Sequence, residues 1–167
     1  MESISPPHAT HREAPGQTSG HSGHESQVRT LEFTRTAFEA LGLSGQQAEQ
    51  AAAEGGAMLS GTLVSVAPLA LGSLTGQVAD DLYMVTVETR LRVDDLNPGQ
   101  VVSMLAHGPG LLAVHQSTLG CMPDGKVVLH RTVRAASATP QDLAQAMHTT
   151  RQLVQMLWGE GGTPQQQ

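Results

Sequence analysis

The residues best suited to covalent chemistry lie on either side of a turn at residues 123–125. The chain has one cysteine, Cys121, and a histidine on the far side of the turn, His130. Catalysis by such a pair requires a thiol with a lowered pKa and a base within reach. Alternation along two strands places Cys121 on the apolar face and turns His130 to the opposite face. We therefore expect Cys121 to be buried in the core as a small hydrophobic side chain.

The remaining polar residues do not form a catalytic or metal-binding motif. His21 and His24 lie three residues apart, but no cysteine or acidic cluster accompanies them, and a closed metal site needs four ligands. Asp80-Asp81 and Asp94-Asp95 bracket a strand-like segment, which is typical of solvated turns. The glycine-bearing stretch at residues 61–76 matches neither the Walker pattern nor G-x-G-x-x-G. We predict no catalytic residues, no cofactor and no metal.

Composition indicates one domain with polar ends. Of the 167 residues, 1–27 are rich in Ser, Gly, His and Pro and contain almost no apolar side chains, which predicts a disordered N-terminal arm. Residues 159–167 have the same character and are predicted to form a disordered tail. The segment 28–158 is long enough to bury a core without disulfides.

Charge and hydropathy exclude several kinds of partner. The formal net charge is −6 and Lys126 is the only lysine, so a basic surface for nucleic acid is absent from the sequence. No apolar run approaches the ~20 residues of a membrane span, and residues 1–27 lack the features of a secretory signal. A single cysteine fits a reducing compartment, and we expect a cytoplasmic location.

The elements that carry these residues can be predicted from periodicity and caps. Apolar spacing predicts a helix over 28–41, and Ser44 with Gln47 forms a capping box for a short helix over 45–54. The apolar stretch 57–71 predicts either one bent strand or two short ones. Alternation is clearest over 82–93, which predicts the best strand of the chain.

The second half contains a helix, a hairpin and a last helix. Asn97 and Pro98 begin a helix that we expect to break at residues 108–110. Residues 117–122 and 126–133 flank Pro-Asp-Gly and predict an antiparallel hairpin. Thr139 caps an amphipathic helix over 140–158. Segregated strands and helices predict an α+β domain with a small twisted antiparallel sheet.

The second half also resembles a known family in its order and spacing of elements. The stretches "NPGQVVSMLAHGPG", "LGCMPDGKVVLHRTV" and "TPQDLAQAMHTTRQLVQMLW" resemble the CesT-like class I chaperones of bacterial type III secretion. The matching elements are Pro98–His107, Thr118–Met122, Lys126–Val133 and Pro140–Trp158. The resemblance covers roughly residues 28–158 and implies an α-β-β-β-α-β-β-α order. Within that family, the chain is similar to the broad-specificity export-control chaperones of the Hpa type.

The resemblance implies partners and surfaces. It implies a cytoplasmic homodimer that binds type III effector proteins in extended form, keeps them competent for secretion and delivers them to the export ATPase. The middle helix would form the dimer interface, through Val101, Val102, Met104 and Leu105. The effector would lie against the best strand and the first helix, with contacts from Phe33, Tyr83, Val85 and Val87.

Three other interpretations stay open at this point. A roadblock-like adaptor also combines a small sheet with helices and dimerises, but binds a GTPase or a motility protein. The polar arm, residues 1–27, could instead be an export signal, which would make this chain a secreted substrate. An enzyme would require Cys121 within hydrogen-bond reach of a histidine.

Overall fold

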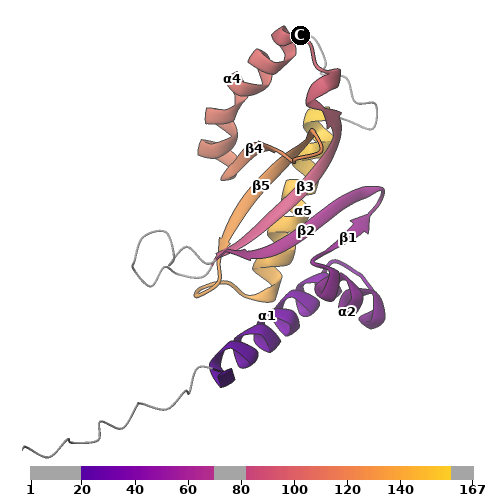
Figure 1. Ribbon diagram of the computed structural model, residues 1–167, viewed down its shortest axis with the longest axis vertical. Coiled ribbons are helices and arrows are strands. Elements are labelled where there is room, and N and C mark those ends of the chain that lie inside the picture. Colours follow the sequence, from indigo (N-terminus) through magenta and orange to yellow (C-terminus); the bar gives the residue numbers. More distant parts are fainter. Residues whose placement is uncertain (1–19, 70–81, 159–167) are drawn as a thin grey trace, which may run out of the picture.

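The computed structural model describes residues 20–69 and 82–158 of the chain (Figure 1). The elements in order are α1 (Gly20–Ala40), α2 (Gly45–Glu54), β1 (Gly56–Leu59), β2 (Thr62–Leu69), β3 (Leu82–Arg92), the 3₁₀ turn η1 (Val93–Asp95), α4 (Pro98–His115), β4 (Ser117–Cys121), β5 (Lys126–Arg134) and α5 (Pro140–Trp158). Of the predicted disordered arm, 1–27, residues 1–19 lie outside the described residues, as does the predicted tail, 159–167. Helices and strands are segregated as the sequence predicts, and the α+β fold class is confirmed.

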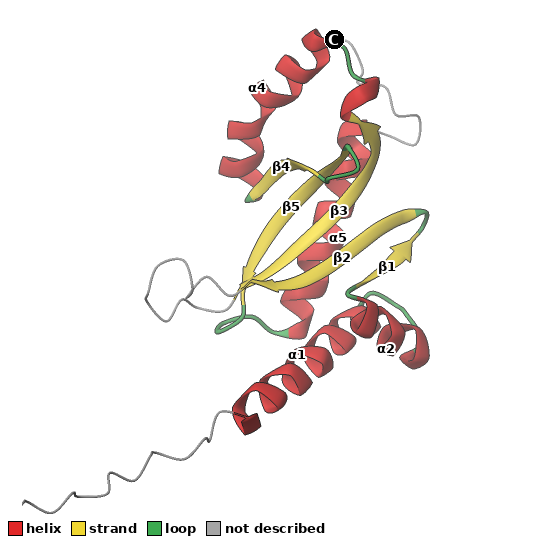
Figure 2. Cartoon of the chain, viewed as in Figure 1, coloured by secondary structure: helices red, strands yellow, loops and turns green. Residues whose placement is uncertain are grey.

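The five strands form one antiparallel sheet in the order β1-β2-β3-β5-β4 (Figure 2). β3 is the central strand, with β2 on one side and β5 on the other. β1 and β4 are the two edges. The last strand of the chain, β5, therefore lies inside the sheet, and the strand before it, β4, lies outside.

One face of the sheet packs against α5, and α1 packs against α5 in turn (Figure 1). Alternation along β3 sends Tyr83, Val85 and Val87 to this face, since successive side chains point to opposite sides. The side chains with no exposed surface in this core include Phe38, Val64, Val85, Val87, Leu129, Leu143 and Met147. The core is built almost entirely of aliphatic side chains, as the low aromatic content requires.

The N-terminal helices differ from the prediction at one boundary. α1 begins at Gly20, eight residues before the predicted Val28, so the helix continues into a segment that composition assigns to the arm. Its C-terminus agrees with the prediction, and Gly42 has a φ of 94°. α2 has the predicted capping box, in which the Ser44 side chain and the Gln47 side chain each accept a hydrogen bond from the other residue's backbone.

The apolar stretch after α2 forms two strands. β1 and β2 are joined by Ser60 and Gly61, which both have positive φ angles, 51° and 78°. Positive φ at both central residues is the geometry of a type I′ turn, whose twist matches that of the flanking strands. Ser60 occupies a position that glycine or asparagine usually takes, which hid the turn in the sequence.

The middle helix is longer than predicted. Instead of breaking at residues 108–110, α4 continues through Pro109 to His115 and ends at Gln116, which has a left-handed conformation. Proline inside a helix removes one hydrogen bond and crowds the preceding turn. Leu111, just beyond the proline, is buried and anchors the second half of the helix. The Asn97–Gln100 capping box fixes the start of α4 as predicted.

The hairpin and the last helix agree with the prediction. Gly125 has a φ of 85°, and the Met122 amide donates to the Lys126 carbonyl at 2.8 Å, which closes the turn. At the start of α5, the Asp142 carboxylate accepts hydrogen bonds from the Thr139 amide and hydroxyl, both at 2.8 Å. These caps explain why both boundaries could be predicted.

Candidate interaction surfaces

Cys121 and His130 do not form a catalytic pair. Cys121 lies opposite Val127 in the β4–β5 ladder, whereas His130 lies opposite Thr118 and points to the other face of the sheet. The predicted separation of the two side chains is confirmed. The prediction that Cys121 is buried is wrong, because it is the last residue of an edge strand and its side chain is exposed. Within residues 20–69 and 82–158, no three His, Cys, Asp or Glu side chains are grouped so as to hold a metal ion.

His130 lies half-buried on the sheet face away from α5. Its Nδ1 is 2.9 Å from the Thr86 hydroxyl on the neighbouring strand β3. Its ring lies over Gly120, where an added Cβ would come within 2.5 Å of Nε2. Burial lowers the pKa of His130, because the imidazolium loses hydration that these neutral neighbours do not replace. Gly120 is therefore the residue that makes room for the ring.

We expect the stability of the protein to fall as the pH drops below about 6.5, the ordinary histidine pKa. Since the folded-state pKa of His130 is lowered, the unfolded chain takes up a proton first, and stability is lost as pH falls from the unfolded pKa to the folded one. The lowered pKa values of Asp124 and Asp142 act only at more acidic pH, below their ordinary 3.8. In thermal melts between pH 5 and 7.5, His130→Gln should flatten the dependence of Tm on pH. An unchanged slope would contradict this assignment.

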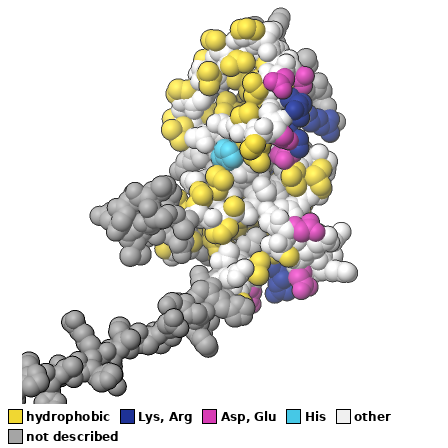
Figure 3. Space-filling view, viewed as in Figure 1, with side chains coloured by type: hydrophobic (Ala, Val, Ile, Leu, Met, Phe, Trp, Pro, Cys, Tyr) yellow, Lys and Arg dark blue, Asp and Glu magenta, His cyan; other side chains and the backbone are white. Residues whose placement is uncertain are grey.

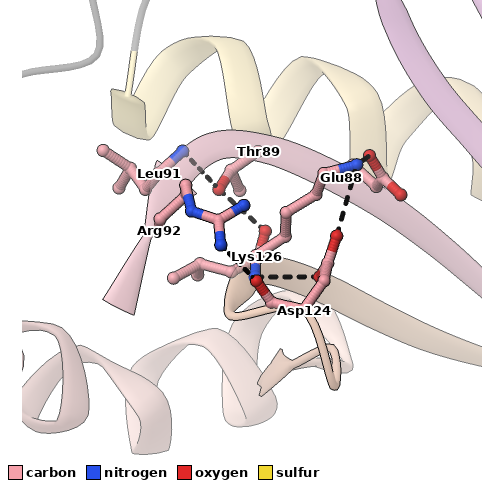
Figure 4. A network of polar contacts seen from close by, with 7 residues as sticks. Glu88, Thr89, Leu91, Arg92, Asp124 and Lys126 are labelled. Atoms are coloured by element: carbon pink, nitrogen blue, oxygen red, sulfur yellow. Dashed lines mark hydrogen bonds and ion pairs between the residues drawn. The ribbon is translucent and has the colours of Figure 1, made fainter. Parts of the chain in front are cut away.

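A polar network holds the end of β3 to the β4–β5 turn (Figure 4). The Lys126 ammonium donates to Glu88 at 2.9 Å, and the Arg92 guanidinium donates to the Asp124 carbonyl. The Thr89 hydroxyl donates to the Val127 carbonyl at 2.8 Å, inside the irregular stretch where the β3–β5 register shifts. The hydrogen bond to Glu88 raises the pKa of Lys126, which stays charged. These contacts position the hairpin, so the charged residues here have a structural role.

The strand predicted to contact an effector is part of the core. Val85 and Val87 have no exposed surface, Tyr83 is 7% exposed, and β3 has hydrogen-bonded neighbours on both sides. This corrects the placement of the predicted binding surface, because a partner could not reach these side chains without opening the core. Phe33 of α1 stacks on Tyr83, with ring centroids 5.1 Å apart and planes within 5°. The structure thus brings these two aromatic residues together, as an internal contact.

Among the described elements, the middle helix carries the most large exposed apolar side chains, namely Val102, Leu105, Leu112 and Val114. α4 has 18 residues, none of them Asp, Glu, Lys or Arg, and Leu111 is its only buried residue. Figure 3 shows hydrophobic side chains gathered over this helix. One side of the helix carries large exposed apolar residues, and we call it the α4 face: Val102, Leu105, Pro109 and Leu112. No helix in the described part of the chain is long and apolar enough to cross a bilayer.

The four residues predicted for a dimer interface divide into two pairs. Val102 and Leu105 are about two-thirds exposed and belong to the α4 face. Val101 and Met104 are half-buried, and Met104 packs against the core. Leu112 was missed because the helix was expected to end before it. Its spacing of seven residues from Leu105 would have identified it if Pro109 had been read as helical.

A groove lies at the opposite end of the molecule, between α2 and β1. It has a volume of about 560 Å³ and is open to solvent. Its walls are the α1–α2 connection, one side of α2 and the whole of β1, and α5 contributes one side chain, Arg151. The other lining residues are Leu41, Gly42, Leu43, Gln47, Gln50, Ala51, Glu54 and residues 56–60. Arg151 is the only basic residue in this lining and Glu54 the only acidic one. Sequence reasoning missed Arg151, since nothing in the pattern of α5 sets it apart.

Comparison with known proteins identifies the fold but not a sequence family. No protein-family model matches the chain, and no curated protein matches its sequence. Among solved structures, a chain of the crystal structure of the ExsC–ExsE complex has a TM-score of 0.50 and 14% sequence identity. The match covers 67% of this chain and 77% of that chain. At this level of identity the two chains share a fold, and the likeness extends over most of both.

Proposed function

We propose that this chain is a chaperone of a type III secretion system that binds a secreted partner protein. The observation that carries the proposal is the shared fold with a chain of the ExsC–ExsE complex, in which ExsC is a type III secretion chaperone. The resemblance noted in the sequence supports the same conclusion from independent features. The chaperone would act in the cytoplasm and deliver its partner to the export ATPase.

The chaperone would be a homodimer formed through the α4 face. An exposed apolar helix face of this kind, with no charged residue on the helix, is typical of protein interfaces. The same helix carries small exposed residues beside the α4 face, Ser103, Ala106, Gly110 and Ala113, which would let a second helix approach closely. A second copy of this chain would cover both α4 faces at once, since a two-fold interface uses the same patch on each subunit.

The partner would be bound in extended form along a sheet edge. Edge strands recruit extended segments through unpaired backbone groups, and side-chain contacts select the sequence. β4 lies beside α4, where the dimer would form, whereas β1 lies at the other end of the sheet with α1 and α2 (Figure 1). β1 is therefore the free edge in the dimer. The exposed side chain of Met58 on β1 offers an apolar contact at this edge.

The test is to identify a partner and show that its secretion depends on this chain. The tagged full-length protein is purified from its source organism under secretion-inducing conditions, and co-purifying proteins are identified by mass spectrometry. We expect one to be a secreted protein whose export falls in a strain that lacks this chain. Its segment bound to the chaperone should gain protection from hydrogen exchange.

Two results would contradict the proposal. If secretion of every co-purifying protein is unchanged in the deletion strain, the chain is not their export chaperone. If a GTPase or a motility protein co-purifies instead, the adaptor interpretation should replace it.

A further inference from the structure

We propose that the groove between α2 and β1 binds an extended peptide segment bearing a side-chain carboxylate, which pairs with Arg151. The inference rests on the proposed function and deepens it, because it states which chemical feature of a partner this chain would select. Three separate observations on the described residues meet at one place: a guanidinium without a polar partner among them, a groove whose one carboxylate already has a partner, and an open strand edge.

The first observation is that Arg151 has no polar partner within the described part of the chain. Its Nε is buried, with no hydrogen bond, and the guanidinium makes no ion pair there. A buried donor without an acceptor costs free energy, more so on a charged group, and such atoms are rare in native proteins. Since Nε itself has almost no exposed surface, an outside acceptor would remove this cost once the Arg151 side chain turns toward the groove that it lines. Arginine matches a carboxylate best, since its fork of N–H groups can bind both oxygens.

The second observation is that the only carboxylate in the groove already has a partner. The Glu54 carboxylate accepts a hydrogen bond from the side-chain Nε2 of Gln50 at 2.8 Å, one turn earlier on α2, and is not within ion-pair distance of Arg151. One cation and one anion leave the groove without net charge. A peptide with a single carboxylate among uncharged residues would bring one negative charge, which Arg151 can pair. A phosphate or a run of acidic residues would bring more negative charge than this one arginine can pair.

The third observation concerns the backbone of β1. Leu59 and Thr62 flank the two-residue turn and form a hydrogen-bonded pair. Because hydrogen-bonded and non-hydrogen-bonded pairs alternate along an antiparallel ladder, the next hydrogen-bonded pair is Ala57 with Val64. The amide and carbonyl of Met58 then point away from β2, along the open edge of the sheet. A peptide aligned by these groups would lie along the rim of the groove. Alternate side chains of the peptide would then point toward Ala57, Leu59 and Arg151, which all line it.

The experiment selects peptides without assuming their sequence. The full chain is immobilised and screened with phage that display random 12-residue peptides, in parallel with the Arg151→Gln variant. We expect clones enriched on the wild type to carry an Asp or Glu among alternating apolar residues, and this preference to disappear on Arg151→Gln. An enriched peptide is then synthesised together with its amide twin, in which Asn or Gln replaces the acid.

The affinities of the twins decide the proposal. On the wild type the acidic peptide should bind about tenfold or more tightly than its amide twin, the scale of a charged hydrogen bond. Arg151→Gln should bind the two equally, Arg151→Lys should keep part of the difference, and Glu54→Gln should increase it. Matching melting temperatures check that the variants fold.

Three outcomes would overturn the carboxylate site: no enriched peptide, no acidic preference, or the same discrimination by Arg151→Gln. The proposed function is judged separately. If selected peptides without an acid compete with the co-purified partner, the chaperone function stands and the carboxylate site falls. If secretion of the partner does not depend on this chain, the chaperone function itself falls.

Discussion

Leu105→Glu is expected to convert the protein from a dimer to a monomer. Leu105 is 67% exposed on the α4 face, so the glutamate is solvated in the monomer and leaves its fold intact. In the proposed dimer the same carboxylate would be buried against apolar side chains of the second copy. An unpaired buried charge costs about 3–5 kcal/mol, which corresponds to a dissociation constant weakened about 100-fold or more. Light scattering coupled to size exclusion at several concentrations measures the change.

Met156→Glu is the matched control for this variant. Met156 lies on α5 and is 69% exposed, so the same charge replaces an equally exposed apolar residue away from α4. It should remain dimeric, and both variants should keep the wild-type circular dichroism spectrum. A wild-type protein that is monomeric at micromolar concentration, or a Met156→Glu variant that dissociates as readily as Leu105→Glu, would remove the α4 face as the dimer interface.

Val87→Asp is expected to unfold the protein. Val87 has no exposed surface at the centre of β3, and its two partners in the sheet are the fully buried Val64 and Leu129, which cannot pair with a carboxylate. Losing the packed side chain and burying a charge together cost about 4–5 kcal/mol or more, a large part of the stability of a typical domain. Circular dichroism and urea denaturation should show a variant that is unfolded or aggregated at 25 °C.

Thr132→Asp separates this effect from the general cost of aspartate in a strand. Thr132 is exposed on β5, opposite Met84 and on the sheet face away from α5. Its replacement should cost less than about 1 kcal/mol, the range of β-propensity. If Val87→Asp were folded and as stable as Thr132→Asp, the central position of β3 in the core would be wrong.

Local signals predicted the ends of elements well. The capping boxes at Ser44 and Asn97 and the turn at Asp124-Gly125 all rest on contacts between residues three or four apart. Such contacts can be read from the sequence because the partners lie next to each other in the chain. Pro109 is the exception, since its helical conformation depends on the burial of Leu111, which is a tertiary contact.

The position of each strand in the sheet could not be predicted in the same way. Alternation identified β3 as a strand, but not that β5 would pair with its second edge and bury Val85 and Val87. The order of the strands was also what the prediction for Cys121 lacked. Cys121 was expected to be buried because its strand carries apolar residues, but that strand lies at the edge of the sheet and the side chain is exposed. That Arg151 has no polar partner among residues 20–69 and 82–158 is also a tertiary property, because it depends on which side chains come together on folding.

The pairing of β3 with β5 also has a consequence for the order in which the chain folds. Thr86 and His130, which lie opposite each other in the ladder, are separated by 44 residues, and α4 and β4 lie between them. Contacts this distant close late, because the entropy of closing a long loop must be overcome first. During synthesis, β3 therefore leaves the ribosome before the strand that will cover its second edge. Until residues 126–134 emerge, the strand that carries Tyr83, Val85 and Val87 has an open side, and the nascent chain is exposed to aggregation during that interval.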